Sequence, residues 1–378
     1  MKAGWKVRQI EDVAFIQEGP GIRKYEYEEG GFPMINVRCV QDGYIDMSSA
    51  RAANTELATG KWKHFQVDEG DILFTISGTI GRCAIVQKSD LPLLMNTSVV
   101  RFRPTVRELD SRFLYLFLQS EGFQEPLKLL SSGTAIRNVG PTHIKTLSIP
   151  LPPLEEQQRI VAVLDEAFEG LARARAHAEA NLQNARELFE SVLDEAVHSG
   201  KPNWRTMTVA DTMNCTKVPA KIQRKAYLEK GDFPIVSQEA ALINGYWSDA
   251  DDVIHLQQPV VVFGDHTRAL KYVDFDFVVG ADGTQIMAPI ECFDPRFYYY
   301  ALKTINLEGK GYARHFSHLK KCEIHFPTSI EEQQGIASQL DEVSVNAHDL
   351  EKRYARVLQN LDDLRQSLLQ KAFAGELT

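Results

Sequence analysis

The sequence predicts an α+β protein in which two mixed α/β domains are separated by a pair of long antiparallel coiled-coil helices, with the two halves related by a pseudo-twofold repeat. Three observations predict this: a motif that occurs twice, a heptad pattern after each copy, and strand-like runs elsewhere. A chain of 378 residues also exceeds one ordinary core. The expected segments are a domain at 1–150, a helix at 151–199, a domain at 200–327 and a helix at 328–378.

An internal repeat organises the chain. The motif Leu-Glu-Glu-Gln-Gln-Arg-Ile at Leu154–Ile160 returns as Ile-Glu-Glu-Gln-Gln-Gly-Ile at Ile330–Ile336. The same shift along the chain relates two Leu-Asp-Glu triplets and two Leu-Gln-Asn triplets further on. The larger segments echo each other only weakly, which indicates a common frame that carries two different domains.

Each motif leads into a helix with apolar residues at alternating steps of four and three, the a/d pattern of a coiled coil. Asn181 is predicted as a polar position in the seam that fixes the register. The predicted seam residues are Ile160, Leu164, Leu171, Ala178, Asn181 and Leu188 in the first helix, and Ile336, Leu340, Leu350, Tyr354, Leu361 and Leu368 in the second. If a pseudo-twofold axis crosses the helices, they run antiparallel; the alternative is that each packs separately on its own domain.

The large segments are predicted to be irregular, sheet-based domains with a few helices. Apolar, β-branched runs separated by turn signals indicate the strands. Examples are Asp71–Ile76, Ser98–Arg103, Pro259–Phe263 and Phe277–Val279, and short helices are expected at Ser111–Gln119 and Pro295–Leu302.

The acidic charge of the chain is confined to the helices. The net charge is −9, but the four segments carry +1, −6, 0 and −4 in order. The two large segments are near neutral, so each has room for a local basic face of the kind that binds DNA. The five cysteines are scattered and are interpreted as reduced thiols. Without an apolar signal core or an apolar run of membrane length, the chain is expected to be cytoplasmic.

Catalytic motifs are missing from the sequence. It contains no phosphate-binding Walker loop, no amino-methyltransferase motif pair and no zinc-protease motif. The pair His315 and His318 has metal-ligand spacing on a helix, but ordinary histidines are the preferred interpretation, and no metal site is predicted. This pattern favours a binding protein that is not itself an enzyme.

Four polar loops are the candidate DNA contacts. Small-residue and basic loops bind phosphate through backbone N–H groups and place arginine in a groove. In the first large segment, the candidates are Ser77, Thr79 and Arg82 in one loop and Thr134, Arg137, Asn138 and Lys145 in a later one. In the second, they are His266, Thr267, Arg268 and Lys271, followed by Arg314, His315, Lys320 and Lys321. Ordinary hairpin turns and solvated charge clusters are the alternatives.

These motifs resemble those of Type I restriction-modification specificity subunits over nearly the whole chain. The doubled Glu-Glu-Gln-Gln motif before matched heptads carries the resemblance, together with the runs Gly70–Arg82 and Val260–Arg268, which look like that family's target-recognition domains. The resemblance implies that each domain reads one half of a bipartite, asymmetric target in double-stranded DNA. It also implies that the helices set the gap between the halves and dock two methyltransferase subunits, which restriction/translocase subunits then join.

No cofactor is expected in this chain. In such complexes S-adenosylmethionine, ATP and Mg²⁺ belong to the partner subunits. Other interpretations stay open: a target-reading module of another restriction or phage-defence complex, a coiled-coil scaffold with two ligand-binding domains that bind no nucleic acid, or a cryptic nuclease.

Overall fold

The computed structural model describes residues 2, 4–131, 139–198, 203–216, 218–280, 283–307 and 314–377. The chain divides into two compact units, one made of Met1–Ala178 with Arg356–Thr378 and the other of Glu179–Ala355. Each unit combines one sheet-rich domain with parts of both long helices. The expected segment boundaries at residues 150, 199 and 327 stay predictions, because the two compact units divide the chain after Ala178 and after Ala355 instead.

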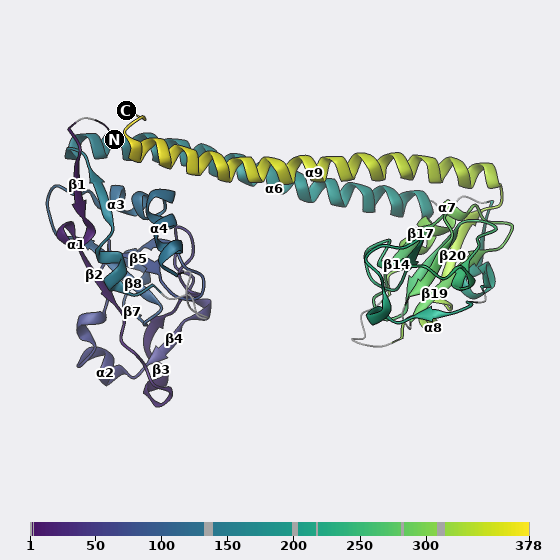
Figure 1. Ribbon diagram of the computed structural model, residues 1–378, viewed down its shortest axis with the longest axis horizontal. Helices are drawn as coiled ribbons and strands as arrows, with labels where there is room; N and C mark the ends of the chain where they lie inside the picture. The colour runs from purple at the N-terminus through teal and green to yellow at the C-terminus, as the bar shows by residue number, and fades with distance from the viewer. Residues whose placement is uncertain are drawn as a thin grey trace. The chain divides into compact units, whose positions relative to one another are not determined.

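Two sheets and a two-stranded ribbon form the domain of the first unit (Figure 1). The strands are β1 (Lys6–Gln9), β2 (Ala14–Glu18), β3 (Tyr27–Ile35), β4 (Arg51–Ala53), β5 (Ile72–Thr75), β6 (Cys83–Ile85), β7 (Leu94–Met95), β8 (Val99–Pro104) and β9 (Ser148–Leu151). The antiparallel four-stranded sheet has the order β2-β8-β5-β6, and the other has the order β4-β3-β7, with β3 and β7 parallel. The ribbon pairs β1 with β9.

The core of this domain explains why β5 is apolar along its whole length. Ile72 and Phe74 face one cluster of buried residues that includes Phe123, whereas Leu73 faces another that includes Ile35 of the second sheet. A strand covered on both faces needs apolar side chains at every position. The helices of this unit outside the long pair are α1 (Ile10–Val13), α2 (Thr55–Thr59), α3 (Ser111–Leu118), α4 (Glu121–Ser131) and α5 (Pro141–Lys145).

The second unit repeats this topology with different residues. Its strands are β10 (Trp204–Thr208), β11 (Met213–Cys215), β12 (Lys221–Ile222), β13 (Phe233–Val236), β14 (Gly245–Trp247), β15 (Val253–Ile254), β16 (Val260–Gly264), β17 (Leu270–Val273), β18 (Phe277–Gly280), β19 (Thr284–Pro289) and β20 (Glu323–Pro327). The order β11-β19-β16-β17 matches β2-β8-β5-β6, and the parallel pair β13 and β18 matches β3 and β7. The helices α7 (Pro295–Lys303) and α8 (Phe316–Leu319) take the places of α3 and α5 in the chain order.

The long helices pair with each other inside each unit. They are α6 (Leu154–His198) and α9 (Ile330–Ala374). In the first unit the guanidinium of Arg365 lies 4.6 Å from the ring centre of Phe168, and Arg175 forms an ion pair with Asp362. Numbers rise along α6 as they fall along α9, so the pairing is antiparallel, as predicted.

The C-terminal end of α9 also packs on the first domain. The ring of Phe373 lies 5.1 Å from that of Phe113 and 5.3 Å from that of Phe117, both on α3. The helix that follows the second domain thus completes the core of the first. This contact contradicts the alternative that each helix packs only on its own domain, and the predicted fold class is confirmed.

The seam differs in detail from the prediction. Asn181 is exposed and Leu188 is 50% exposed, so the prediction is wrong for these two, and the partly buried residues are Leu182 and Phe189 instead. From Leu171 onward, the residues that face the partner helix are spaced four and then three apart. The predicted seam residues were spaced three and then four apart. Of the other predicted residues, Ile160, Leu164, Ala178 and Leu340 are buried, and Leu171, Ile336, Leu350, Tyr354, Leu361 and Leu368 are partly buried.

The first Gln of each repeated motif joins a domain to its helix. Gln157 is fully buried, and its Nε2 donates to the carbonyl oxygens of Glu108 at 2.7 Å and Pro152 at 2.9 Å. Its Oε1 accepts from the backbone N–H of Asp110 at 2.9 Å, the residue whose carboxylate caps α3. One amide side chain thus satisfies three buried backbone groups, which would otherwise cost free energy.

Gln333 repeats this arrangement in the second unit. It is fully buried, donates to the carbonyl oxygens of Cys292 at 2.9 Å and Pro327 at 2.8 Å, and accepts from the N–H of Asp294 at 2.8 Å. Asp294 in turn caps α7. We call these two sites the glutamine junctions. They explain why the first Gln of the motif occurs in both copies: it joins each domain to its long helix.

Candidate nucleic-acid interface

The loop between β5 and β6 places Ser77, Thr79 and Arg82 at the surface. Its ends are closed by hydrogen bonds from Thr75 N–H to Arg82 O and from Arg82 N–H to Thr75 Oγ1, both at 3.0 Å. Gly78 and Gly81 have φ angles of 71° and 104°, a region that glycine adopts without strain. Thr79 is exposed, and Ser77 and Arg82 are partly exposed. The loop therefore presents polar side chains on a fixed backbone.

Two distant segments meet this loop. The N–H of Val139, the first described residue after the 132–138 stretch, donates to Ile76 O at 3.1 Å. The turn after β3 also lies close to the loop, since a Cβ at Gly78 would come within 3.8 Å of Val37. We call this meeting of the β5–β6 loop, the turn at Val37 and the segment that begins at Val139 the first loop corner. Val139, which follows one of the predicted loops in the chain, therefore lies against the other predicted loop.

The loop between β16 and β17 has the same place in the second unit. It is closed by a hydrogen bond from Gly264 N–H to Ala269 O at 2.9 Å. Arg268 has a φ of 62°, the only described residue other than glycine with a positive φ, and its Nη1 donates to Leu307 O at 2.6 Å. A non-glycine residue held in this conformation is uncommon and points to a site with a function.

The same two kinds of segment meet here as well. The N–H of His315 donates to Asp265 O at 2.9 Å, and Thr267 Oγ1 donates to Gln238 O in the turn after β13. The N–H of Phe316 adds a hydrogen bond of 2.8 Å to the Asp265 carboxylate. The β16–β17 loop, the turn at Gln238 and the segment at His315 form the second loop corner. Both units thus build one geometry from unrelated side chains.

Burial corrects two of the predicted contacts. Lys271 is 5% exposed, and its Nζ donates to Ser237 O at 2.8 Å and to Asn244 Oδ1 at 3.0 Å. Desolvation lowers the pKa of Lys271 to about 8. His315 is 3% exposed and sits beneath the loop. Neither side chain reaches the surface, so both support the second corner and are not direct DNA contacts.

The remaining described candidates are exposed or partly exposed. His266, Lys145 and Lys320 are partly exposed, and Lys320 Nζ lies 5.3 Å from the ring centre of Phe316. Thr267, Arg268, Arg314 and Lys321 are exposed. Thr134, Arg137 and Asn138 lie outside the described residues.

A pair of basic turns was missed by the sequence reasoning. The turn η1 (Lys24–Glu26) precedes β3, and η6 (Arg224–Ala226) precedes β13. Lys24 and Lys225 are exposed, and neither has an acidic partner among the described residues. The signal in the sequence was an Arg-Lys pair in both segments, directly after Ile22 in one and after Ile222-Gln223 in the other.

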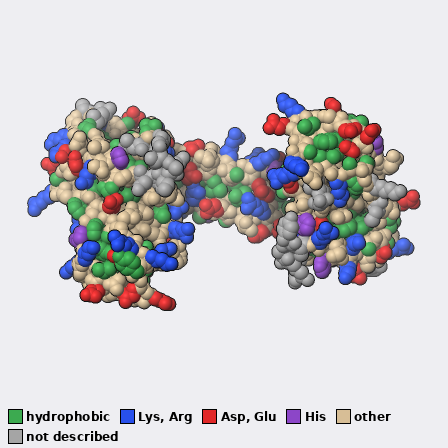
Figure 2. All heavy atoms as spheres, turned by 60° about the horizontal axis from the view of Figure 1, so that its bottom comes forward, with side chains coloured by type: hydrophobic (Ala, Val, Ile, Leu, Met, Phe, Trp, Pro, Cys, Tyr) green, Lys and Arg blue, Asp and Glu red, His purple; other side chains and the backbone are tan. Residues whose placement is uncertain are grey.

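The charge on each unit is mixed. On the face shown in Figure 2, Lys and Arg side chains lie among Asp and Glu in both units. This mixed surface is consistent with the near-neutral charge of the two large segments. No group of three or more potential metal ligands occurs among the described residues, and no described helix has the length and apolar character needed to cross a membrane.

Comparison with known proteins places the chain in a family. Residues 2–177 and 201–360 match the family model for the Type I restriction modification DNA specificity domain. The EcoKI specificity subunit of Escherichia coli K12 is 21% identical over 99% of this chain and 89% of that protein. The EcoBI specificity subunit of Escherichia coli is 29% identical over 44% of this chain, and that match covers 35% of its own length. The match to the MjaIX specificity subunit of Methanocaldococcus jannaschii covers 61% of its length.

Two solved structures share the fold. A chain from work on complex assembly and conformational transition of the type I R-M system superposes with a TM-score of 0.81 at 20% identity, over 100% of this chain and 99% of that one. The HsdS subunit of Thermoanaerobacter tengcongensis gives a TM-score of 0.57 at 19% identity, over 100% and 98%. Because two copies of the family domain cover most of the sequence, the chain belongs to the family of Type I restriction modification DNA specificity domains.

Proposed function

We propose that this chain is the DNA-reading subunit of a Type I restriction-modification complex and that each loop corner reads one half of a bipartite, asymmetric target. The observation that carries the proposal is the equivalence of the two corners. Each is formed by the same three segments on the same topology, yet the outward side chains differ. Two readers of one design with different residues suit a target whose halves differ in sequence.

The chemistry of the corners supports base and phosphate contacts. Arg82 and Arg268 each lie on a loop whose backbone is fixed, and arginine binds the N7 and O6 atoms of guanine in a bidentate manner. Lys24 and Lys225 on the basic turns suit phosphate contacts, which add affinity without sequence preference. Two readers in one chain also raise each other's effective concentration on DNA.

The proposed partners rest on the resemblance to the family. We propose that the long helices dock two methyltransferase subunits, which restriction/translocase subunits join, and that S-adenosylmethionine, ATP and Mg²⁺ act in those partners. The acidic net charges of the helix segments, −6 and −4, support this assignment, because acidic faces repel DNA and suit a protein partner.

Methylation mapping tests the proposal. Genomic DNA from the host with and without this gene is sequenced for modified bases, and a single motif with two unlike halves and a fixed gap is expected to disappear on deletion. Binding of the purified chain, with its methyltransferase partner, to a duplex carrying that motif is the direct check. A motif that persists without the gene would rule the function out.

A further inference from the structure

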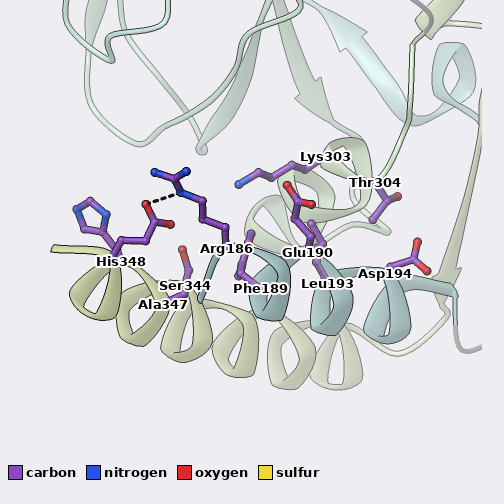
Figure 3. Close-up of a pocket in the computed structure, with 11 residues that line it drawn as sticks. Arg186, Phe189, Glu190, Leu193, Asp194, Lys303, Thr304, Ser344, Ala347 and His348 are labelled. Carbon is purple, nitrogen blue, oxygen red and sulfur yellow. Dashed lines mark ion pairs between the residues drawn. The ribbon is translucent and has the colours of Figure 1, made fainter. Parts of the chain in front are cut away.

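Among the described residues, an ion pair joins α6 to α9 in each unit. In the first unit Arg175 pairs with Asp362. In the second, Arg186 Nε lies 3.6 Å from Glu351 Oε2, and the dashed line in Figure 3 marks this pair. It borders a groove of about 650 Å³ between the two helices and the end of α7. Both arginines belong to α6 and both acids to α9.

The repeat turns these two pairs into one pattern. When the two copies of the motif are aligned, Arg175 corresponds to Glu351, and Arg186 corresponds to Asp362. The two helices therefore use the same two repeat positions with opposite charge. A pseudo-symmetric pair of helices could carry any charges at these positions, and this chain carries complementary ones.

The pattern has a consequence for pairing with a second copy of the chain. In the observed register, position 175 faces position 362, whose equivalent on α6 is position 186. An α6–α6 pair in that register sets Arg175 against Arg186 of the second copy, twice. An α9–α9 pair sets Glu351 against Asp362 in the same way. Like charges at such spacing destabilise a helix pair, and opposite charges stabilise it.

Parts of the apolar seam are alike in the two helices, although other positions differ, as at Ala178 and its equivalent Tyr354. Leu164 and Leu340 hold equivalent repeat positions and are both fully buried. Leu193 and Leu369 are also equivalent and buried, at 4% and 0% exposure. A self-pair would thus find leucine where the native pair has leucine. The four charges therefore distinguish the two arrangements, whereas these leucine positions do not.

We propose that Arg175, Arg186, Glu351 and Asp362 form a pairing code, by which α6 and α9 accept each other and reject a second copy of themselves. The code makes the two halves of the chain a matched set. It does not depend on what the domains bind, so its failure leaves the proposed DNA function untouched.

A cleaved form of the full chain tests the code. A protease site is inserted between α6 and β10, and the folded chain is cut there, so that the two halves stay together only through their contacts and lose the high effective concentration of a tether. Two preparations with different tags are mixed. Native mass spectrometry then counts the cross-paired species, in which an α6 half binds an α9 half, and the self-paired species, in which two α6 halves or two α9 halves bind each other.

Charge swaps supply the variants. Arg186→Glu with Glu351→Arg keeps both native pairs complementary, but gives each helix one cation and one acid, so self-pairing becomes complementary too. Arg175→Asp with Asp362→Arg does the same at the other pair. All four substitutions together restore like charges in the self-pairs, and this variant is the matched control.

The expected result is a rise of self-paired species in both two-residue swaps and a return to the original level in the four-residue swap. Four contacts change from like to opposite, each worth about a factor of two to three, so the exchange constant rises on the order of 30-fold. Raising the salt concentration shrinks the difference. Uncut variants should unfold at a temperature close to that of the original chain, because both ion pairs between the helices stay complementary.

Equal distributions in all four proteins, or no self-paired species in any, overturn the proposal. Discrimination would then lie in the shape of the seam, where Phe373 packs against Phe113 and Phe117 in the first unit and the equivalent residue in the second is Val197.

Discussion

The glutamine junctions and the loop corners differ in how they use the repeat. At the junctions both units have the same side chain with the same three kinds of backbone partner, at 2.7, 2.9 and 2.9 Å for Gln157 and 2.9, 2.8 and 2.8 Å for Gln333. At the corners both units keep the main-chain contact and change the side chains around it. The frame is thus specified by side chains and the corners by the backbone, and under the proposed function stability depends on the junctions and selectivity on the corners.

The largest effect is expected at the junctions. Gln157→Ala leaves three backbone groups without partners in a buried site, so the free energy of unfolding should fall by about 3 kcal/mol, and Gln333→Ala should cost a similar amount. Urea unfolding followed by circular dichroism measures both. The exposed neighbours Gln158→Ala and Gln334→Ala are the controls and should cost less than about 0.5 kcal/mol. Unequal losses at 157 and 333 would break the equivalence of the junctions.

Lys271 should give the second unit a pH dependence of its own. Its folded pKa of about 8 lies below the unfolded value of about 10.4, so the unfolded chain binds more protons between these values and stability rises with pH across that window. The contribution should grow by about 2 kcal/mol from about pH 7.5 to about pH 9.5.

The difference in unfolding free energy between the original chain and Lys271→Met isolates this contribution, since other titrating groups cancel. The exposed Lys321→Met serves as the control and should leave the pH profile unchanged. If Lys271→Met also leaves the pH profile of the unfolding free energy unchanged, the buried amine keeps its ordinary pKa. The first unit has Ala84 at the matching strand position, so it should contribute no such effect.

Selectivity should separate the two corners. Arg268→Gly removes the side chain and keeps the positive φ without strain, and Arg82→Ala is its counterpart in the first corner. Each should weaken discrimination in one half of the target by on the order of 1.5 kcal/mol, about tenfold, and leave the other half intact. Binding to a library of duplexes, with the methyltransferase partner present, reads out both halves at once. A loss spread evenly over both halves would argue against separate readers.

The smallest effect is expected at the basic turns. Lys24→Ala and Lys225→Ala should weaken binding to all duplexes alike and lower the slope of log affinity against log salt by about 0.9 each. Titrations at several salt concentrations measure that slope. Lys371→Ala on the exposed surface of α9 is the control and should leave it unchanged. A change in sequence preference at Lys24 or Lys225 would recast these residues as base readers.

The fold could be predicted from the sequence wherever a sequence pattern is compatible with only one structure. The repeated motif and the heptads predicted paired antiparallel helices, and the short helix expected at Ser111–Gln119 is α3 at Ser111–Leu118. The seam phase did not follow, because Leu182 and Phe189 are apolar neighbours of Asn181 and Leu188 and either set continues the heptad. Contacts with the rest of each unit decided between them.

The site was predictable only in outline. Loop composition located the β5–β6 and β16–β17 hairpins, but burial separates Lys271 from Arg268, three residues apart in one loop region. Charge and polarity in a sequence do not say whether a lysine points to solvent or back to Ser237 and Asn244. The basic turns were missed because a two-residue Arg-Lys pair becomes meaningful only when the fold puts both copies at the same place.

The main-chain closure of the corners bears on how such a protein diversifies. The bonds from Val139 to Ile76 and from His315 to Asp265 involve only peptide groups, which every substitution other than proline preserves. Outward side chains can therefore be exchanged while the loops keep their shape. A lineage of such chains can explore new DNA preferences by single replacements, each variant inheriting an already working architecture.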